Sequence, residues 1–286
     1  MEKIYCPICK SNDNSDLISV NNRLQEKDNV IYNIVKCICG LVYLNPRPPE
    51  AEINRYYFSD DYDPHRIKQY SITDLAYRAV QKLALNFKFY KIRKYFRSGN
   101  LLDIGCGNGE FGEFMNSKGF NVVIQDNFSN YKGDLEFHKD LESIKSKFNI
   151  ISLWHVLEHI HNLDRLFDFL NHSLHKNGIL VIAVPNHDAF ERKYFTDKWA
   201  PYDAPRHLYH FDDVSLKGLL KKYGYNIVHK NIMLHDSFYN VMLSIRKYNF
   251  KNLVKFLKII FLCILNPIIN GTKNSSTIMV ICKKIS

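Results

Sequence analysis

The sequence has few of the features that direct a chain into or across a membrane. Its first residues contain no basic segment followed by an apolar one, so we expect no signal peptide. The longest apolar run, residues 259–265, is far shorter than the roughly 20 residues that cross a bilayer. Internal repeats and low-complexity tracts are absent, and the 46% of hydrophobic residues is ordinary for a globular chain. We therefore expect a folded, cytoplasmic protein.

Acidic side chains are scarce in the last quarter of the chain. Residues 214–286 hold twelve Lys or Arg and one acid, Asp236, and this excess accounts for the net charge of +10. Residues 1–60, by contrast, hold seven basic and eight acidic side chains, so the N-terminal part offers no electrostatic attraction for phosphates. We therefore do not expect nucleic acid as a partner.

Strands and helices alternate from about residue 100 onward, which predicts a doubly wound α/β fold with a parallel sheet covered on both faces. We predict a head at 1–48, a linker and helical cap at 49–98, and an α/β domain at 99–286. The predicted strands are 100–104, 121–125, 135–138, 149–154, 179–184, 225–233 and 276–284, and the predicted helices are 73–97, 110–118, 162–175 and 213–223.

The most specific stretch is "NLLDIGCGNGEFGEF" at residues 100–114. An apolar strand runs into alternating glycines and then a helix, and the pattern G-x-G-x-x-G, with Asp126 after the next strand, also fits a dinucleotide site. The added feature is Asp103, two residues before the first glycine. A carboxylate there suits a cationic amine better than a pyrophosphate. S-adenosylmethionine carries an ammonium group and NAD does not, so the loop favours S-adenosylmethionine.

Three further stretches extend this pattern, namely "VVIQD" at 122–126, "FNIISLWHVLEHI" at 148–160 and "NGILVIAVPN" at 177–186. With them, residues 75–286 resemble the class I S-adenosylmethionine-dependent methyltransferases. The resemblance implies a seven-stranded, mostly parallel sheet whose last strand is antiparallel. It also implies transfer of a methyl group from the cofactor to an acceptor.

The resemblance implies a set of cofactor-binding residues along the carboxyl edge of the sheet. An acid and two glycines of the first loop hold the methionine end, the acid after the second strand takes the ribose hydroxyls, and two residues after the third strand lie against the adenine. In that order they are Asp103, Gly105 and Gly107, then Asp126, then Asp140 and Leu141, with Cys106, Asn127 and Trp154 completing the set.

The stretch "WHVLEHIH" at 154–161 also fits the H-x-x-E-H pattern of a class of zinc peptidases. In those enzymes the paired histidines lie within a long helix, whereas here they follow directly on a predicted strand. We therefore interpret the stretch as a methyltransferase loop. His155, close to the cofactor by chain position, is a candidate general base, and we interpret Glu158 and His159 as structural.

The head carries two cysteine pairs. Cys6 and Cys9 lie in "CPIC", and Cys37 and Cys39 lie in "CICG". Four thiolates satisfy tetrahedral zinc, so we predict a structural zinc ribbon, and the head resembles that of a bacterial methyltransferase subgroup. In that subgroup the second pair is spaced C-x-x-C, whereas one residue separates the cysteines here. Free buried cysteines or a decayed site are the alternative.

The stretch "KWAPYDAPRHLYHF" at 198–211 lies within a loop, 186–212, where this fold usually covers its acceptor. It contains the subgroup's pattern D-x-P-R-H-L-x-H-F in full. Its aromatic side chains suit a sugar or a ring, Arg206 suits a phosphate or carboxylate, and His207 is the second candidate base, with His210 a third. Structural ion pairing or packing is the alternative for each.

The resemblance suggests a small-molecule acceptor, either a hydroxyl of a sugar in a surface-polysaccharide precursor or a quinone-like ring. Two other interpretations remain open from the sequence. One is an rRNA or tRNA methyltransferase with a zinc-ribbon head, and the other is a cofactor-binding protein without catalytic activity.

The segment "KNLVKFLKIIFLCILNP" at 251–267 predicts an apolar helix that ends at Pro267 and carries Lys251, Lys255 and Lys258 on one side. A basic amphipathic helix can lie on an anionic membrane surface, which would place the protein at the inner face of the membrane. The alternative is that the helix packs over the sheet or forms a dimer seam.

Overall fold

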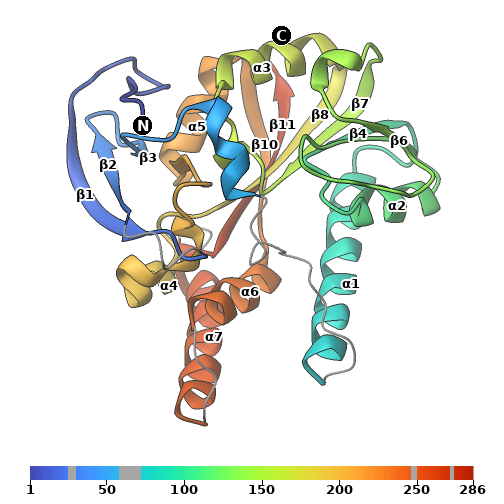
Figure 1. Ribbon diagram of the computed structural model, residues 1–286. Coiled ribbons are helices and arrows are strands. Elements are labelled where there is room, and N and C mark those ends of the chain that lie inside the picture. Colours follow the sequence, from blue (N-terminus) through green and yellow to red (C-terminus); the bar gives the residue numbers. More distant parts are fainter. Residues whose placement is uncertain (25–29, 58–71, 246–249, 271–273, 286) are drawn as a thin grey trace.

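Two β-sheets and the helices that pack on them form the molecule (Figure 1). The computed structural model describes residues 1–24, 30–57, 72–245, 250–270 and 274–285. None of the helices in these ranges is both long enough and apolar enough to cross a membrane.

The larger sheet has seven strands: β4 (Asn100–Ile104), β5 (Asn121–Gln125), β6 (Glu136–His138), β7 (Phe148–Trp154), β8 (Leu174–Pro185), β10 (Tyr225–Ile232) and β11 (Thr277–Lys284). Their spatial order is β10-β11-β8-β7-β4-β5-β6; β11 runs antiparallel to both of its neighbours, and the other adjacent pairs are parallel. The predicted fold class is therefore confirmed. Strands β5 and β7 lie on opposite sides of β4, and ligands in such sheets bind outside the carboxyl ends of the strands at this switch point.

Helices cover both faces of this sheet: α1 (Ile72–Arg93) and α2 (Glu110–Ser117) on one, and α3 (Leu163–Ser173) and α5 (Asp213–Lys222) on the other. The reason is the alternation of apolar side chains along the strands. Leu101 packs in the core with α1 and α2, whereas its neighbour Leu102 packs in the core with α3 and α5. All four predicted helices are present, although α1 ends at Arg93, earlier than predicted.

The smaller sheet is antiparallel and contains β1 (Asn14–Asn21), β2 (Ile31–Cys37), β3 (Val42–Leu44) and β9 (Tyr209–His210). Its first three strands belong to the head, but β9 comes from the 186–212 loop and pairs with β3. Buried side chains of the head, such as Tyr43 and Leu44, also join the core of the larger sheet. The domain boundary at residue 48 stays a prediction, but the head and the α/β domain share a sheet and a core.

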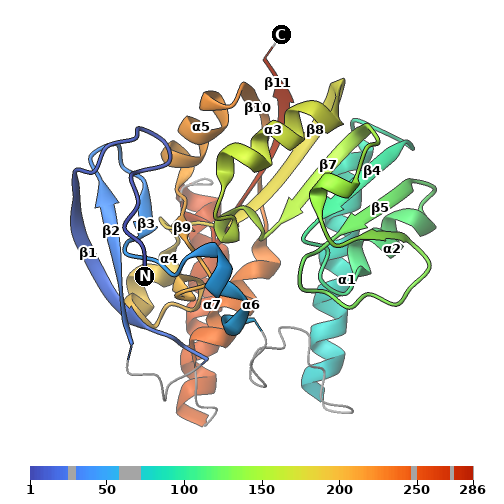
Figure 2. The ribbon, with the colours of Figure 1, turned by 45° about the horizontal axis from the view of Figure 1, so that its top comes forward.

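Three helices lie together at one end of the molecule: α4 (Phe190–Phe195), α6 (Leu234–Ser244) and α7 (Phe250–Asn270). Figure 2 shows α6 and α7 extending away from the strands, as α1 also does. The predicted end of the tail helix at Pro267 is wrong, because α7 continues to Asn270. A proline removes one hydrogen bond from the ladder, and near a helix end this loss is tolerated.

Candidate functional site

Glycines at left-handed backbone angles shape the loop after β4. The φ angle is +67° at Gly105 and +80° at Gly109, values that other residues rarely adopt. A Cβ on Gly105 would lie 2.3 Å from Cγ2 of Val156, so there is no space for a side chain between this loop and the loop after β7. The two loops therefore touch at the carboxyl edge of the sheet, where the sequence predicts the cofactor.

Asp103, near the end of β4, is a buried acid. It is 2% exposed, and the Ser152 hydroxyl donates a hydrogen bond of 2.7 Å to its Oδ1. Burial raises the pKa of this carboxyl from 3.8 to about 7. A cationic ligand beside it would restore the charged form, so Asp103 fits a role in holding an ammonium group.

Asp126, directly after β5, ties two loops together. Its Oδ2 accepts a hydrogen bond of 2.9 Å from the N–H of Gly107. Its Oδ1 accepts hydrogen bonds of 2.7 and 2.8 Å from the N–H groups of Phe128 and Ser129. Because a carboxylate oxygen accepts two hydrogen bonds, Oδ2 retains capacity for one further donor, such as a ribose hydroxyl.

The loops after β5 and β6 lie side by side at the same edge. The N–H of Asp126 donates to the carbonyl oxygen of His138 at 3.1 Å. Asp140 and Leu141 follow two residues later, where the short helix η2 (Leu141–Ser143) begins. Asn127, on the other loop, is exposed and accepts a hydrogen bond of 2.7 Å from Nε2 of Gln125. The two loops are therefore neighbours at the carboxyl edge of the sheet.

Trp154, the last residue of β7, lies against a cation from α1. Nζ of Lys88 is 4.3 Å from a ring centroid of Trp154, and Phe111 packs edge-on against the indole at 5.2 Å. Burial lowers the pKa of Lys88, against the attraction of Asp236 and Asp103. Nothing in the sequence indicates Lys88, because α1 carries no motif.

His155 has a φ angle of +56° and faces two carboxylates. Its Nε2 lies 3.1 Å from Oδ2 of Asp236, and its Nδ1 lies 3.6 Å from Oε1 of Glu158. Burial disfavours the imidazolium, but the two carboxylates outweigh it and raise the pKa of His155 to about 9. His155 is therefore a cation near neutral pH.

His159 and His207 lie edge to face, with ring centroids 4.5 Å apart. Nδ1 of His159 is 3.0 Å from the carbonyl oxygen of Arg206 and 2.8 Å from the hydroxyl of Tyr57. Nδ1 of His207 is 2.7 Å from the carbonyl oxygen of Pro201. Burial lowers the pKa of each histidine to about 4. Both rings are therefore neutral, with the proton on Nδ1 and a lone pair on Nε2.

Glu158 completes a group of three side chains, which we call the Glu-His-His cluster: Glu158, His159 and His207. One potential ligand atom from each residue lies within 4.8 Å of the others. The sequence reasoning interpreted Glu158 and His159 as structural, but the structure brings both to His207. The H-x-x-E-H motif contains Glu158 and His159 and could have indicated the cluster. The third member, His207, could not be predicted because it comes from a distant loop.

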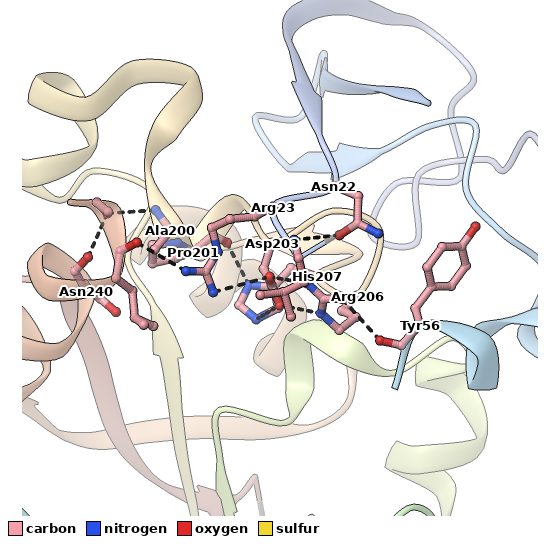
Figure 3. A network of polar contacts seen from close by, with 12 residues as sticks. Asn22, Arg23, Tyr56, Ala200, Pro201, Asp203, Arg206, His207 and Asn240 are labelled. Carbon is pink, nitrogen blue, oxygen red and sulfur yellow. Dashed lines mark hydrogen bonds and ion pairs between the residues drawn. The ribbon is translucent and has the colours of Figure 1, made fainter. Parts of the chain in front are cut away.

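Arg206 has a different place from the one predicted. It is fully buried, and its Nε and Nη2 donate hydrogen bonds of 2.9 and 2.6 Å to the two carboxylate oxygens of Asp203. Its Nη1 donates to the carbonyl oxygen of Tyr56 at 3.2 Å. Figure 3 shows Asp203 between Arg206 and Arg23, whose Nη2 is 3.9 Å away. The expectation that Arg206 grips an acceptor does not fit this geometry.

Most of the aromatic side chains expected to face the acceptor lie in the core instead. Trp199, Tyr202, Tyr209 and Phe211 are each 1–2% exposed. His210 is 4% exposed and packs edge-on against Tyr202, with ring centroids 5.2 Å apart. Strand β9 carries two of these residues into the head sheet, so its pairing with β3 turns them away from solvent.

The four cysteines of the head converge despite the short spacing of the second pair. The sulfur of Cys6 is 3.5 Å from that of Cys39, and the sulfur of Cys9 is 3.4 Å from that of Cys37. All four sulfurs lie within 4.8 Å of one another. Tetrahedral zinc with Zn–S bonds of about 2.3 Å requires S–S separations of roughly 3.8 Å. The donor set therefore fits one metal ion.

Residues 72–230, more than half of the chain, match a family model described as "Methyltransferase domain". The chain belongs to this methyltransferase family. Together with the glycine loop and the strand order, the match identifies a class I S-adenosylmethionine-dependent methyltransferase domain in this chain.

Two curated proteins similar to this methyltransferase are named "Ubiquinone biosynthesis O-methyltransferase". The one from Pelagibacter ubique is 28% identical over 120 residues, which is 37% of this chain and 50% of that protein. The one from Rickettsia conorii is 25% identical over 127 residues, 40% of this chain and 44% of that protein. The chain thus spans about half the length of the curated relatives that it matches.

Solved structures also align with the methyltransferase. A SAM-dependent methyltransferase from Archaeoglobus fulgidus aligns with a TM-score of 0.48 and 20% identity, covering 72% of this chain and 94% of that one. Phosphoethanolamine N-methyltransferase 2 from Haemonchus contortus, in complex with S-adenosyl-L-methionine, aligns with a TM-score of 0.48 and 15% identity. The alignment covers 70% of this chain and 53% of that one.

We expect the methyltransferase to bind S-adenosylhomocysteine more weakly as the pH falls through about 7. The pKa of Asp103 is raised to about 7, so its carboxylate is present above that pH and protonated below it. Affinity should fall about eightfold between pH about 7.5 and pH about 6, measured by calorimetry. Asp103→Asn should bind weakly with no such pH dependence. An unchanged affinity of the wild type over this range would remove Asp103 from the cofactor site.

Proposed function

We propose that this methyltransferase transfers a methyl group from S-adenosylmethionine to a hydroxyl group on the ring of a small molecule. The observation that carries the proposal is the Glu-His-His cluster beside the loop that contacts Gly105. We propose that the acceptor hydroxyl binds beside the two neutral imidazoles of this cluster. The names of the two curated relatives, both O-methyltransferases of ubiquinone biosynthesis, support a ring hydroxyl over a sugar.

The cofactor supplies the methyl group on a sulfonium, which is a good leaving group, so the protein has to align the acceptor and activate it. We propose that Asp103, Gly105, Cys106 and Gly107 hold the methionine end. We further propose that the remaining members of the predicted set hold the adenosine: Asp126, Asn127, Asp140, Leu141 and Trp154. The capacity left on Asp126 Oδ2 and the burial of Asp103 support these roles.

We place activation of the hydroxyl at His207 and not at His155. Both ring nitrogens of His155 face carboxylates, so this ring holds its proton. Nδ1 of His207 lies within hydrogen-bond distance of the Pro201 carbonyl, which places the lone pair of the neutral ring on Nε2, 4.0 Å from Oδ2 of Asp203. Arg206 is then a positioning residue, because its ion pair with Asp203 fixes the loop that carries His207 (Figure 3).

His207→Gln should lower kcat by roughly 10²–10⁴-fold and leave the affinity for S-adenosylhomocysteine within about twofold. His155→Gln is the matched control, and we expect it to lower kcat less than about tenfold. Single-turnover kinetics measure both effects, with a ring compound that the acceptor experiment shows to be methylated. The reverse order of effects would make His155 the base.

The acceptor is tested by supplying S-adenosylmethionine with three sets of compounds: ring compounds with adjacent hydroxyls, nucleotide sugars, and bulk tRNA and rRNA. Mass spectrometry of the acceptor reports the gain of one methyl group. We expect methylation in the first set alone. Methylated RNA or a methylated sugar would replace the proposal. Cofactor binding without any methylated product would favour a non-catalytic protein.

We propose that the four head cysteines hold one structural zinc ion, Cys6, Cys9, Cys37 and Cys39 being the ligands. The head is too small to form a hydrophobic core of its own. The metal would hold the turn before β1 and the turn after β2 together. Nζ of Lys222 in α5 donates to the carbonyl oxygen of Pro7, so this knuckle also contacts the α/β domain.

We also propose that α7 contacts an anionic membrane surface. Apolar side chains at i, i+3, i+7 and i+10 of this helix are exposed: Val254 by 55%, Leu257 by 58%, Phe261 by 62% and Ile264 by 39%. Lys255 and Lys258 are exposed next to them. A basic helix with an uncovered apolar stripe suits the interface of an anionic bilayer.

Binding to anionic liposomes should fall at least about tenfold when Lys251, Lys255 and Lys258 become Gln, because each charge near the surface contributes about 1 kcal/mol. Co-sedimentation at low and high salt measures this. The control replaces Lys94, Lys217 and Lys221, which are exposed on other helices or next to them. Equal losses of liposome binding in the two triple variants would indicate general charge attraction. Unchanged binding in the α7 variant would indicate that α7 packs against protein and not against a membrane.

A further inference from the structure

The carboxylate of Glu158 is buried and makes no hydrogen bond with the described residues, and its recorded ion-pair partner is His155. The residue is 0% exposed, and neither carboxylate oxygen has a hydrogen-bond partner among the described residues. The nearest recorded cation is His155, whose Nδ1 is 3.6 Å from Oε1, beyond a normal hydrogen bond. Carboxylates buried in this way are usually paired or coordinate a metal.

The two imidazoles of the Glu-His-His cluster are oriented as metal ligands are. Nδ1 of His159 and Nδ1 of His207 each lie within hydrogen-bond distance of a backbone carbonyl, that of Arg206 and that of Pro201. Such bonds fix the ring and place the lone pair on Nε2, which in His207 lies 4.0 Å from Oδ2 of Asp203. Metal-ligating histidines characteristically donate their other N–H to a carbonyl or carboxylate in this manner.

The three donors come together from two loops. Glu158 and His159 lie on the turn η3 (Leu157–His159) after β7, and His207 lies in the 186–212 loop. We propose that Glu158, His159 and His207 form a second metal site, distinct from the cysteine cluster, that binds one divalent first-row transition metal ion. The geometry behind this is the mutual approach of their ligand atoms, all within 4.8 Å.

The donor types decide the class of metal. Two imidazoles and one carboxylate suit zinc or a similar transition metal, whereas magnesium and calcium prefer an all-oxygen set. Three protein ligands also leave coordination positions open. His159 and His207 are only partly exposed, the side chain of His207 by 12%. The site is therefore of the open type and not of the closed type that the four cysteines form.

An open metal beside the cofactor loop would bind the acceptor oxygen and lower the pKa of its hydroxyl, as metals do for bound water. The proton would leave to solvent, and the methyl group would pass from the sulfonium to the oxygen. This role rests on the proposed function, but metal binding does not. With the metal bound, His207 is a ligand and not a free base, so the metal would take the place of its imidazole in activating the hydroxyl.

The experiment loads the full-length protein with excess Zn²⁺, removes free metal by gel filtration, and measures zinc per chain by mass spectrometry. Glu158→Gln and His159→Gln should each bind one zinc ion per chain fewer than the wild type. His155→Gln, whose ring lies beside Glu158 but outside the cluster, should bind as much as the wild type. Equal zinc content in all four proteins would overturn the proposal.

Thermal unfolding of the metal-free proteins gives a second readout that does not depend on activity. Glu158→Gln removes a buried carboxylate that makes no hydrogen bond, but it also removes the ion pair with His155, so its metal-free Tm is compared with that of His155→Gln, which loses the same pair. Adding Zn²⁺ should raise Tm more in the wild type than in Glu158→Gln. Equal Tm shifts would also overturn the site. A site that binds zinc while no hydroxyl is methylated would reject the proposed function alone.

Discussion

Cys6→Ser is expected to release the zinc ion of the head and to destabilise the whole protein. Cys6 is fully buried and belongs to the same hydrophobic core as the larger sheet, so we expect loss of the metal to destabilise the α/β domain as well as the head. Loss of a structural metal is among the few changes that cost several kcal/mol, and we expect about 3–5 kcal/mol. Zinc content by mass spectrometry and the free energy of unfolding in urea measure the two effects.

Cys106→Ser is the control for this prediction. Cys106 is half-buried in the glycine loop and lies outside the cysteine cluster, so its replacement should leave the zinc content unchanged. Full zinc content in Cys6→Ser would show that the head cysteines are not the zinc ligands. Loss of zinc without loss of stability would mean that the paired strands and the shared core hold the head by themselves.

Arg206→Met is expected to destabilise the protein by about 3 kcal/mol. It removes both hydrogen bonds from the guanidinium to Asp203 and leaves that carboxylate in a buried position. The Arg206 charge, opposing burial, holds the pKa of Asp203 well below its usual range. Arg23 remains 3.9 Å from the carboxylate, which limits the loss. Urea unfolding near neutral pH gives the value.

Arg206→Lys separates the structural role from the originally predicted role in binding the acceptor. A lysine keeps the charge but cannot make the two parallel hydrogen bonds, so we expect a smaller loss of stability. If the arginine instead bound a charged acceptor, both variants would raise KM with little change in the free energy of unfolding. That outcome would contradict the position of the side chain in Figure 3.

The acid-dependent unfolding of the wild type follows from the same pair. Because the folded-state pKa of Asp203 is depressed, its contribution to stability is present above the ordinary carboxyl pKa and is lost as the pH falls below it. In Arg206→Met this part of the acid sensitivity should shrink. Because the Arg206–Asp203 pair lies in the loop that carries His207, the acid dependence of unfolding reports on the stability of that loop.

The sequence by itself determined the fold and the position of the cofactor loop. The alternation of strands and helices is a local property of the chain, and it predicts a parallel sheet covered on both faces. The loop after β4 needs glycines because its backbone adopts left-handed angles and packs against Val156 without space for a side chain. The same requirement explains both the motif and the geometry of the loop. The convergence of the head cysteines was likewise predicted from four residues.

The protonation and exposure of the candidate site residues were decided only by the tertiary structure. His155 and His207 look alike in the sequence as candidate bases. His155 meets Asp236 from 81 residues away, whereas His207 meets the backbone of Pro201. Arg206 pairs with Asp203 inside its own loop, but burial makes this pair structural. Burial and charge depend on which distant groups the fold brings together, and no local pattern carries that information.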